Sequence, residues 1–185
     1  MKKILSLILV FSFLFCLTAC GNKTEQNYEK LVEYIKMNGE KNGTTYSITT
    51  NFSDLSTVWE ENSGFVTISV DSSNTLHLEE SYSNYITHIE YQLGKEDCEI
   101  KTINNSDSGT QYVSTAKFSI KVDPSSSTLK DFKADNTSLG VKNAQYLLSG
   151  SANLLLVRTN MVFKFLNIGV TLKDIGLPNG RTNYY

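Results

Sequence analysis

The sequence predicts an α+β domain in which one antiparallel meander sheet of about six strands carries an N-terminal helix and a long C-terminal helix, both packed on one face. Three observations support this fold class. Residues alternate between apolar and polar from Thr44 to Val122, whereas apolar residues recur with a period of 3.6 on both sides of that region. The turns between the expected strands are short, and parallel neighbours would need long crossovers. The length of 185 residues suits one such domain.

A helix is expected at the start of the domain. Its apolar residues fall on one face at spacings of i, i+3, i+4 and i+7: Tyr28, Leu31, Val32 and Ile35. Glu25 lies in the expected first turn, Lys36 lies near the end, and Gly39 fits a C-cap. The polar segment from Asn38 to Gly43 predicts a turn before the strands begin.

Six strands are expected next, each identified by its alternating pattern. The residues that mark them are, strand by strand, Tyr46, Ile48, Thr50 and Phe52; Val66, Ile68 and Val70; Leu76, Leu78 and Tyr82; Tyr85, Ile89, Tyr91 and Leu93; Cys98 and Ile100; and Ala116, Phe118, Ile120 and Val122. Turns are expected at Asp71 to Asn74, at Ser83-Asn84 and at Gly94 to Asp97. Ser83-Asn84 is a poor two-residue hairpin turn because it lacks Gly.

Helical periodicity returns at the C-terminus. Pro124 ends the last strand, and 128–133 is expected to form a short turn of helix. From Lys142, a period of 3.6 persists for six turns through these residues: Ala144, Leu147, Leu148, Ala152, Leu155, Leu156, Thr159, Val162, Phe163 and Leu166. Arg158 and Lys164 interrupt this helix, so it is expected to lie on the sheet rather than to span a membrane. Gly169 and the segment 177–180 contain the Gly and Pro residues that are typical of the end of a helical region.

The charge of the chain argues against a nucleic-acid partner. It carries 17 basic and 19 acidic side chains, for a net charge of −2. Loss of Lys2 and Lys3 with a targeting segment would make the remainder more acidic. Proteins that bind nucleic acid usually show a basic excess gathered on one face.

The first twenty residues have the order of a secretory signal peptide. Lys2 and Lys3 form a cationic start, Ile4 to Leu17 is an almost unbroken apolar run, and small residues precede Cys20. The apolar run is shorter than the roughly 20 residues that cross a hydrocarbon core as a helix. The sequence therefore predicts a cleaved signal peptide at 1–19, a tether at 20–25 and one globular domain at 26–185.

Leu17-Thr18-Ala19-Cys20 followed by Gly21 resembles the lipobox of bacterial lipoproteins. The resemblance covers only the N-terminus, and it implies that the Cys20 thiol receives a diacylglyceryl group before cleavage. Acyl chains such as palmitate would then hold the protein on the extracytoplasmic face of the bacterial cell membrane. The alternative is an ordinary secretory signal in which Cys20 is incidental. Cys16 lacks the small residue before it.

Cysteine usage leaves one thiol in the mature domain. Cys16 leaves with the signal peptide and Cys20 is alkylated, so Cys98 has no internal partner for a disulfide. We expect Cys98 to be a small buried apolar side chain. A catalytic role for Cys98 would need a nearby His.

Two His and two Glu form the candidate metal site. If Tyr82 lies opposite Tyr85, Glu79 faces His88 and His77 faces Glu90 on the face away from the core. Such a group can bind zinc, but opposite charges across strands are also common on a solvated sheet face. If Leu93 lies opposite Cys98, Glu90 meets Lys101. Cys98 then lies on the core face, away from both His residues.

Other candidate motifs are weaker. Ser114 to Lys117 and Ser127 to Lys130 match the S-x-x-K pattern of penicillin-interacting serine enzymes, but about two such matches arise by chance in this composition. Four tyrosines suggest an aromatic binding patch or the edge of the core: Tyr82, Tyr85, Tyr91 and Tyr112. Trp59 is either a core residue or a rim contact. The sequence has no P-loop and no dinucleotide fingerprint, and no cofactor is expected.

Three function classes remain open. The favoured one is a monomeric, non-catalytic binding or accessory module that recognises a protein, peptide or glycan at the envelope. The alternative is an envelope hydrolase, metal-assisted through His77, Glu79, His88 and Glu90. A weaker alternative is a carrier of lipid or another hydrophobic ligand, which an apolar pocket between helix and sheet would indicate.

Overall fold

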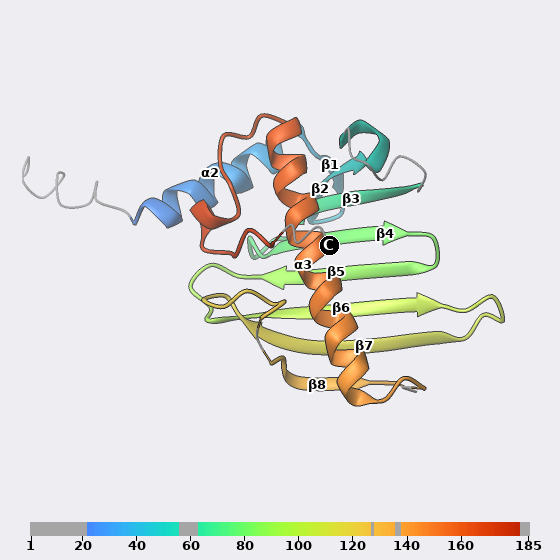
Figure 1. Cartoon of the computed structure of the whole chain (residues 1–185). Helices are drawn as coiled ribbons and strands as arrows, with labels where there is room; N and C mark the ends of the chain where they lie inside the picture. Colours follow the sequence, from blue (N-terminus) through green and yellow to red (C-terminus); the bar gives the residue numbers. More distant parts are fainter. Residues whose placement is uncertain (1–21, 56–62, 127, 136–137, 182–185) are drawn as a thin grey trace, which may run out of the picture.

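The computed structural model describes residues 22–55, 63–126, 128–135 and 138–181. Within these residues, one sheet of eight strands follows the order β1-β2-β3-β4-β5-β6-β7-β8, with every neighbouring pair antiparallel. Helix α2 (Lys23–Asn38) precedes the sheet and helix α3 (Val141–Phe165) follows it (Figure 1). The predicted α+β class and the antiparallel meander are confirmed.

The strand bounds are β1 (Glu40–Asn42), β2 (Thr45–Asn51), β3 (Gly64–Val70), β4 (Leu76–Tyr82), β5 (Tyr85–Tyr91), β6 (Asp97–Asn105), β7 (Gln111–Ser119) and β8 (Lys130–Ala134). Short 3-10 helices occur at η1 (Phe52–Leu55) and η2 (Lys173–Ile175). Strands β2 to β7 correspond to the six that the alternation predicts, but four of the expected strand residues lie beyond the strand ends: Phe52, Leu93, Ile120 and Val122.

The two additional strands, β1 and β8, are the edges of the sheet. Strand β1 lies inside the segment 38–43 that was predicted as a turn, and β8 replaces the helical turn predicted at 128–133. Both predictions are wrong for the same physical reason. Strand β1 is exposed throughout and most of β8 is too, so each lacks an apolar pattern of its own and is specified by pairing with its neighbour.

Helix α2 matches its sequence pattern closely. Its four expected apolar residues are buried, and the Asn22 side chain accepts a hydrogen bond from the Thr24 backbone N–H at the N-terminus. Gly39 donates its N–H to the Ile35 carbonyl oxygen. A Cβ at Gly39 would lie 2.6 Å from that oxygen, so the helix end is packed too tightly for any side chain. The helix begins at Lys23, inside the range predicted as a tether.

Helix α3 crosses the sheet and packs against strands β3 to β8. The buried residues of its central and C-terminal turns include Ala152, Leu155, Leu156, Val162 and Phe163, as its periodicity predicts. The chain then folds back through η2, where Tyr91 donates a hydrogen bond to the Ile175 carbonyl oxygen at 2.8 Å. No helix in the described part of the chain is long and apolar enough to cross a membrane.

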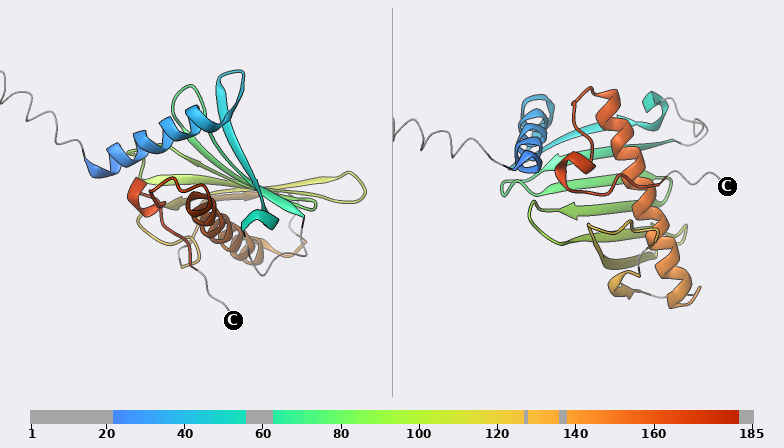
Figure 2. Two further views of the ribbon diagram at one scale, coloured as in Figure 1. Left: turned by 90° about the horizontal axis from the view of Figure 1, so that it is seen from above. Right: turned by 60° about the vertical axis from the view of Figure 1, so that its left-hand side comes forward.

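Both helices and the C-terminal segment cover one face of the twisted sheet, here called the core face (Figure 2). The predicted hairpin register is confirmed, with Tyr82 opposite Tyr85 and Glu79 opposite His88. The next register is wrong by two residues: Glu90 lies opposite Glu99, and Lys101 lies opposite His88. The β5–β6 connection contains a turn at Gly94 and is longer than expected, but a shift of two residues leaves every side chain on its predicted face.

Candidate functional site

The core face changes from apolar to polar along the strands. One row of paired residues across β3 to β7 is apolar: Ile68, Leu78, Ile89, Ile100 and Ala116. The next row in the same direction is largely polar: Val66, Glu80, Thr87, Thr102 and Ser114. A third row, across β4 to β7, contains Tyr82, Tyr85, Asn104 and Tyr112. The second and third rows therefore place hydroxyls, an amide and aromatic rings side by side.

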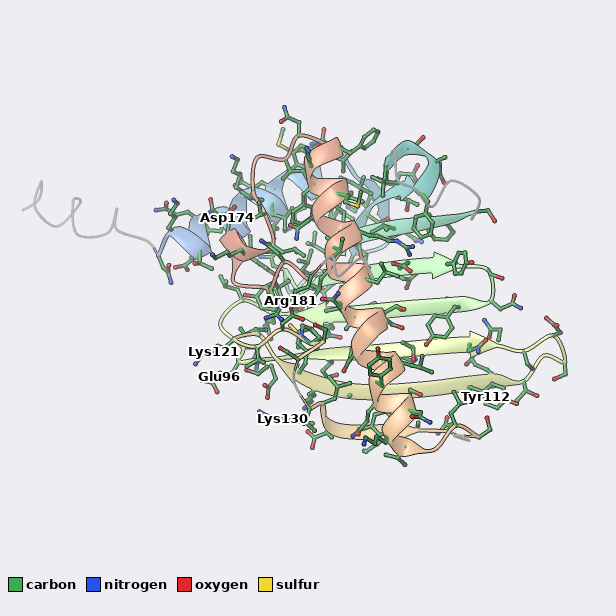
Figure 3. The ribbon with its side chains drawn as sticks, in the orientation of Figure 1. Glu96, Tyr112, Lys121, Lys130, Asp174 and Arg181 are labelled. Carbon is green, nitrogen blue, oxygen red and sulfur yellow. The ribbon has the colours of Figure 1, made fainter. Side chains whose placement is uncertain are left out.

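A pocket of about 320 Å³ lies above this polar region, between the first turns of α3 and strands β5 to β7. The sheet contributes Tyr85, Thr102, Asn104, Tyr112 and Ser114 to its lining. Figures 1 and 3 show that strands β4 to β7 extend past α3 on the side away from α2, and Tyr112 lies there. We call this hollow the helix–sheet pocket.

The opposite wall of the helix–sheet pocket is apolar. Helix α3 and the segment before it contribute Leu139, Ala144, Leu147 and Leu148, together with the polar residues Asp135 and Ser138. Among the described lining residues, Asp135 is the one with a charged side chain. The pocket therefore combines an apolar wall with a floor of neutral hydrogen-bonding groups.

Large apolar side chains are exposed around the mouth of the pocket. Leu139 and Leu147 both line it, yet they are 59% and 48% exposed. Val141, the first residue of α3, is 57% exposed as well. Single exposed apolar residues are common on protein surfaces, but a group of them beside a pocket is typical of a recognition surface.

The polar row includes a buried ion pair between strand β4 and helix α3. Arg158 of α3 contacts the Glu80 carboxylate, and both side chains are about nine-tenths buried. The Arg158 guanidinium also lies 4.2 Å from the centre of the Phe52 ring. Burial raises the pKa of Glu80, which the Arg158 charge opposes. The second carboxylate oxygen, Glu80 Oε2, is buried and has no hydrogen-bond partner among the described residues.

Each member of this pair is visible in the sequence as a charged residue at a core position. The patterns of the strand and of the helix do not show that the two residues meet. Glu80 occupies a core-facing position between Leu78 and Tyr82, which breaks the alternation of β4. Arg158 falls on the apolar stripe of α3 between Leu155 and Val162. Two opposite charges at core positions predict a buried pair, since an unpaired charge there would be costly.

The structure divides the four candidate tyrosines into three groups. Tyr85 and Tyr112 line the helix–sheet pocket. Tyr82 belongs to the same row, but its ring stacks on Phe52 with centroids 6.4 Å apart. Tyr91 is buried three rows away, where its ring meets Tyr28 edge-on. The sequence therefore identified two pocket residues and named Ser114 only as part of an S-x-x-K match, but it missed Thr102 and Asn104, which look like ordinary strand residues.

The two histidines lie together on the outer face of the sheet. His77 Nδ1 is 3.2 Å from His88 Nε2, and His77 Nε2 is 3.4 Å from Asp71 Oδ2. Glu90 and Glu79 lie opposite His77 and His88 in the register. No group of three or more His, Cys, Asp or Glu within the described residues is arranged to hold a metal ion.

The ionisation of this cluster is perturbed. Burial lowers the pKa of His88 to about 4, and the nearby His77 and Lys101 charges add to the effect. Burial acts to raise the pKa of Asp71, but hydrogen bonds from Ser73, Thr75 and His77 outweigh it and hold the value at about 2. The His88 imidazole is therefore neutral at neutral pH.

Two of the remaining candidates, Cys98 and Ser114, lack the partners of an activated nucleophile within the described part of the chain. Cys98 is buried on the core face, and burial raises the pKa of its thiol. Ser114 lies in the middle of β7, and Lys117 points to the other face, where it contacts Glu99 at 3.4 Å. Ser127, Trp59 and Cys20 lie outside the described residues.

Three of the described hollows are larger than the helix–sheet pocket, and the two with the greatest volumes differ from it in character. One of about 610 Å³ lies between α3 and the C-terminal segment, and one of about 680 Å³ lies on the outer face beside His88. The outer hollow is lined by charges of both signs, including Glu99 and Lys117, which pair with each other. Unlike these two hollows, the helix–sheet pocket adjoins the exposed apolar residues Leu139 and Leu147.

Comparison with known proteins gives no family for this chain: no family model, no curated protein and no solved structure matches it. Its function is therefore inferred from the residues of the site.

Proposed function

We propose that this protein is a lipid-anchored, non-catalytic binding module on the extracytoplasmic face of a bacterial cell membrane, and that it holds its ligand in the helix–sheet pocket. The observation that carries the proposal is this pocket, where polar groups from three strands converge opposite an apolar helix face. The lipobox resemblance at Cys20 supports the anchor.

The placement of the pocket suits a tethered receptor. Helix α2, which begins at Lys23, starts at the left of Figure 1, whereas Tyr112 lies on the right, at the opposite end of the strands (Figures 1 and 3). A lipid on Cys20 would hold the first of these ends at the membrane. The pocket would then lie at the end of the strands away from the lipid surface, within reach of soluble or wall-attached ligands.

The lining also supports binding over the other two classes. An acyl-chain carrier needs a mostly apolar cavity, but the floor here carries hydroxyl and amide groups from Thr102, Asn104 and Ser114. A hydrolase needs an activated nucleophile or a bound metal, and the described lining residues include no Cys, His, Lys or Arg. These features favour a site that binds without reacting.

Binding at the pocket is tested by NMR with methyl-labelled full-length protein in detergent micelles. The methyl groups of Leu139, Leu147 and Leu148 report on the pocket, and Val157 and Met161, which line the separate hollow on α3, serve as internal controls. Neutral oligosaccharides, short peptides and fatty acids are added separately. Saturable shifts at the pocket methyls alone are expected with one class, whereas no shift with any class would refute the proposal.

The anchor is tested independently by Cys20→Ala. This variant is expected to lose labelling by radioactive palmitate and to remain as an uncut precursor, since the thiol is the acceptor in the lipobox. Cys16→Ala is the matched control and should mature normally. Normal processing and labelling of Cys20→Ala would contradict the anchor.

The metal-assisted hydrolase rests on the 3.2 Å approach of the His77 and His88 ring nitrogens. Zinc held there would raise the melting temperature of the protein, and His77→Ala with His88→Ala would abolish that rise. We expect no rise with zinc before mutation. A zinc-dependent rise that the double variant removes would instead establish a metal site.

A further inference from the structure

We propose that the ligand of the helix–sheet pocket is an uncharged sugar ring within an oligosaccharide. This inference rests on the proposed binding function and adds to it the chemical class of the ligand. The structural basis is a narrow pocket with an apolar wall on α3 facing a hydroxyl- and amide-bearing floor on the sheet.

The two walls differ in a way that matches a pyranose ring. A sugar ring presents C–H groups on its faces and hydroxyl groups around its edge. Leu139 and Leu147 offer an apolar surface on one side. On the facing strands, Ser114 and the more deeply buried Thr102 carry hydroxyls that both donate and accept hydrogen bonds. An aliphatic chain would leave these strand hydroxyls unpaired on binding, which opposes its entry.

Aromatic rings and an amide complete the recognition groups. Tyr85 and Tyr112 flank Asn104 in one row across β5, β6 and β7. A tyrosine combines a flat apolar ring with a polar hydroxyl, and the Asn104 side chain supplies both a donor and an acceptor. Rings of this kind can lie against the C–H face of a sugar while the amide reaches its hydroxyls.

The charge of the pocket argues against ionic ligands. No Lys, Arg or His is among the described lining residues, so a phosphate or carboxylate would lose its hydration without a cationic partner. The exposed Asp135 could attract a cation, which makes a lysine-containing peptide the strongest competing ligand. Asp135 is held at the mouth by its backbone N–H, which donates to the Val113 carbonyl oxygen at 2.8 Å.

Size and surroundings favour one ring of a longer chain. A volume of about 320 Å³ is near the lower end of known ligand pockets, at roughly 300–1,000 Å³. Leu139 and Leu147 line the pocket and are also exposed, so they would pack against neighbouring sugar units. The pocket and this apolar rim together form a surface that a linear glycan can follow.

The inference is tested by calorimetric titration of the full-length protein in detergent micelles. The probes are N-acetylchitotriose and maltotriose as neutral glycans, trilysine as a cationic peptide and dodecanoate as a fatty acid. At least one neutral glycan is expected to bind saturably, while trilysine and dodecanoate do not.

Two nearly isosteric variants make the test specific to the pocket. Thr102→Val removes one hydroxyl from the pocket floor, and Thr115→Val makes the same change on the outer face of β7. Thr102→Val should weaken glycan binding about tenfold, the effect of one lost hydrogen bond. Thr115→Val should leave glycan binding unchanged, and thermal melting of both variants checks that they fold.

The outcomes separate this inference from the proposed function. Binding of trilysine or dodecanoate at the pocket methyls, without binding of either glycan, would overturn the sugar assignment and leave the binding function in place. Equal loss of glycan affinity in Thr102→Val and Thr115→Val would also overturn it. The absence of any shift at the pocket methyls with every probe would overturn both.

Discussion

The two ends of the sheet's core face belong to the same strands but have opposite chemistry. At the end near α2, Tyr91 and Leu76 are buried beneath α2, η2 and α3, and the apolar residues form one continuous core. At the other end, beyond α3, the strands carry Tyr85, Asn104 and Tyr112, and a pocket remains open. Burial therefore differs along a strand as well as between its faces.

The change from apolar to polar residues occurs over one row of the sheet, which is two residues along a strand. Ile89 belongs to the apolar core, and Thr87, two residues away on the same face, is equally buried but polar. Glu80 lies opposite Thr87 and is neutralised by Arg158. The polar row therefore lies directly beside the apolar core, and the charge of its buried Glu80 is balanced by Arg158.

The largest expected effect comes from breaking that ion pair. Arg158→Met should lower the free energy of unfolding by about 3–5 kcal/mol, because it leaves the buried Glu80 carboxylate without its cation. Urea denaturation at neutral pH measures the loss. The loss should shrink in acid, since a protonated Glu80 needs no cation.

The double variant Glu80→Leu with Arg158→Met is the control for this prediction. It should recover much of the lost stability, because no charge then remains buried at the pair. A cost for Arg158→Met that is below about 1 kcal/mol, or that is the same at all pH values, would mean that the pair does not hold the polar row in place.

The next largest effect compares neighbouring residues on opposite sides of the transition. Ile89→Ala should cost roughly 2–5 kcal/mol through lost burial and a residual cavity. Thr87→Val should change stability by no more than about 1 kcal/mol, because it keeps the shape of the side chain and removes one hydroxyl. Chemical denaturation of both variants gives the order. A costlier change at Thr87 than at Ile89 would show that the hydroxyl row, not the apolar row, stabilises the sheet.

The smallest expected effect is a pH dependence that arises on the outer face. His88 has a pKa of about 4 in the folded protein, against an ordinary value of 6.5. As the pH falls from 6.5 to 4, the unfolded chain therefore takes up a proton at His88 that the folded chain does not, and stability decreases. The expected loss is roughly 1–2 kcal/mol after allowance for partial exposure, and it levels off below pH 4.

His88→Gln isolates this contribution from the other titrating groups. His77, Glu79 and Lys101 face His88 and remain in the variant, and Asp71 titrates at a lower pH of about 2. The difference in unfolding free energy between the two proteins should therefore change between pH 6.5 and 4, as measured by denaturation across that window. A constant difference would mean that His88 is not held neutral by the fold.

The alternation of residues was sufficient to place side chains on the two faces of β2 to β7. Ile89 and Cys98 lie on the core face as predicted, and the register error after Glu90 did not change this, because it was an even number of residues. Periodicity likewise located α2 and α3, since each buries one stripe against the sheet. These properties depend on local spacing, which the sequence contains directly.

The helix–sheet pocket was decided by tertiary structure. The path of α3 across the sheet determines which rows it covers, and that path depends on packing between residues far apart in the chain, such as Arg158 with Glu80. The edge strands β1 and β8 likewise form because a neighbouring strand offers unpaired backbone groups. Thr102, Asn104 and Ser114 resemble other strand residues in the sequence, and they line a pocket because α3 leaves parts of their two rows uncovered.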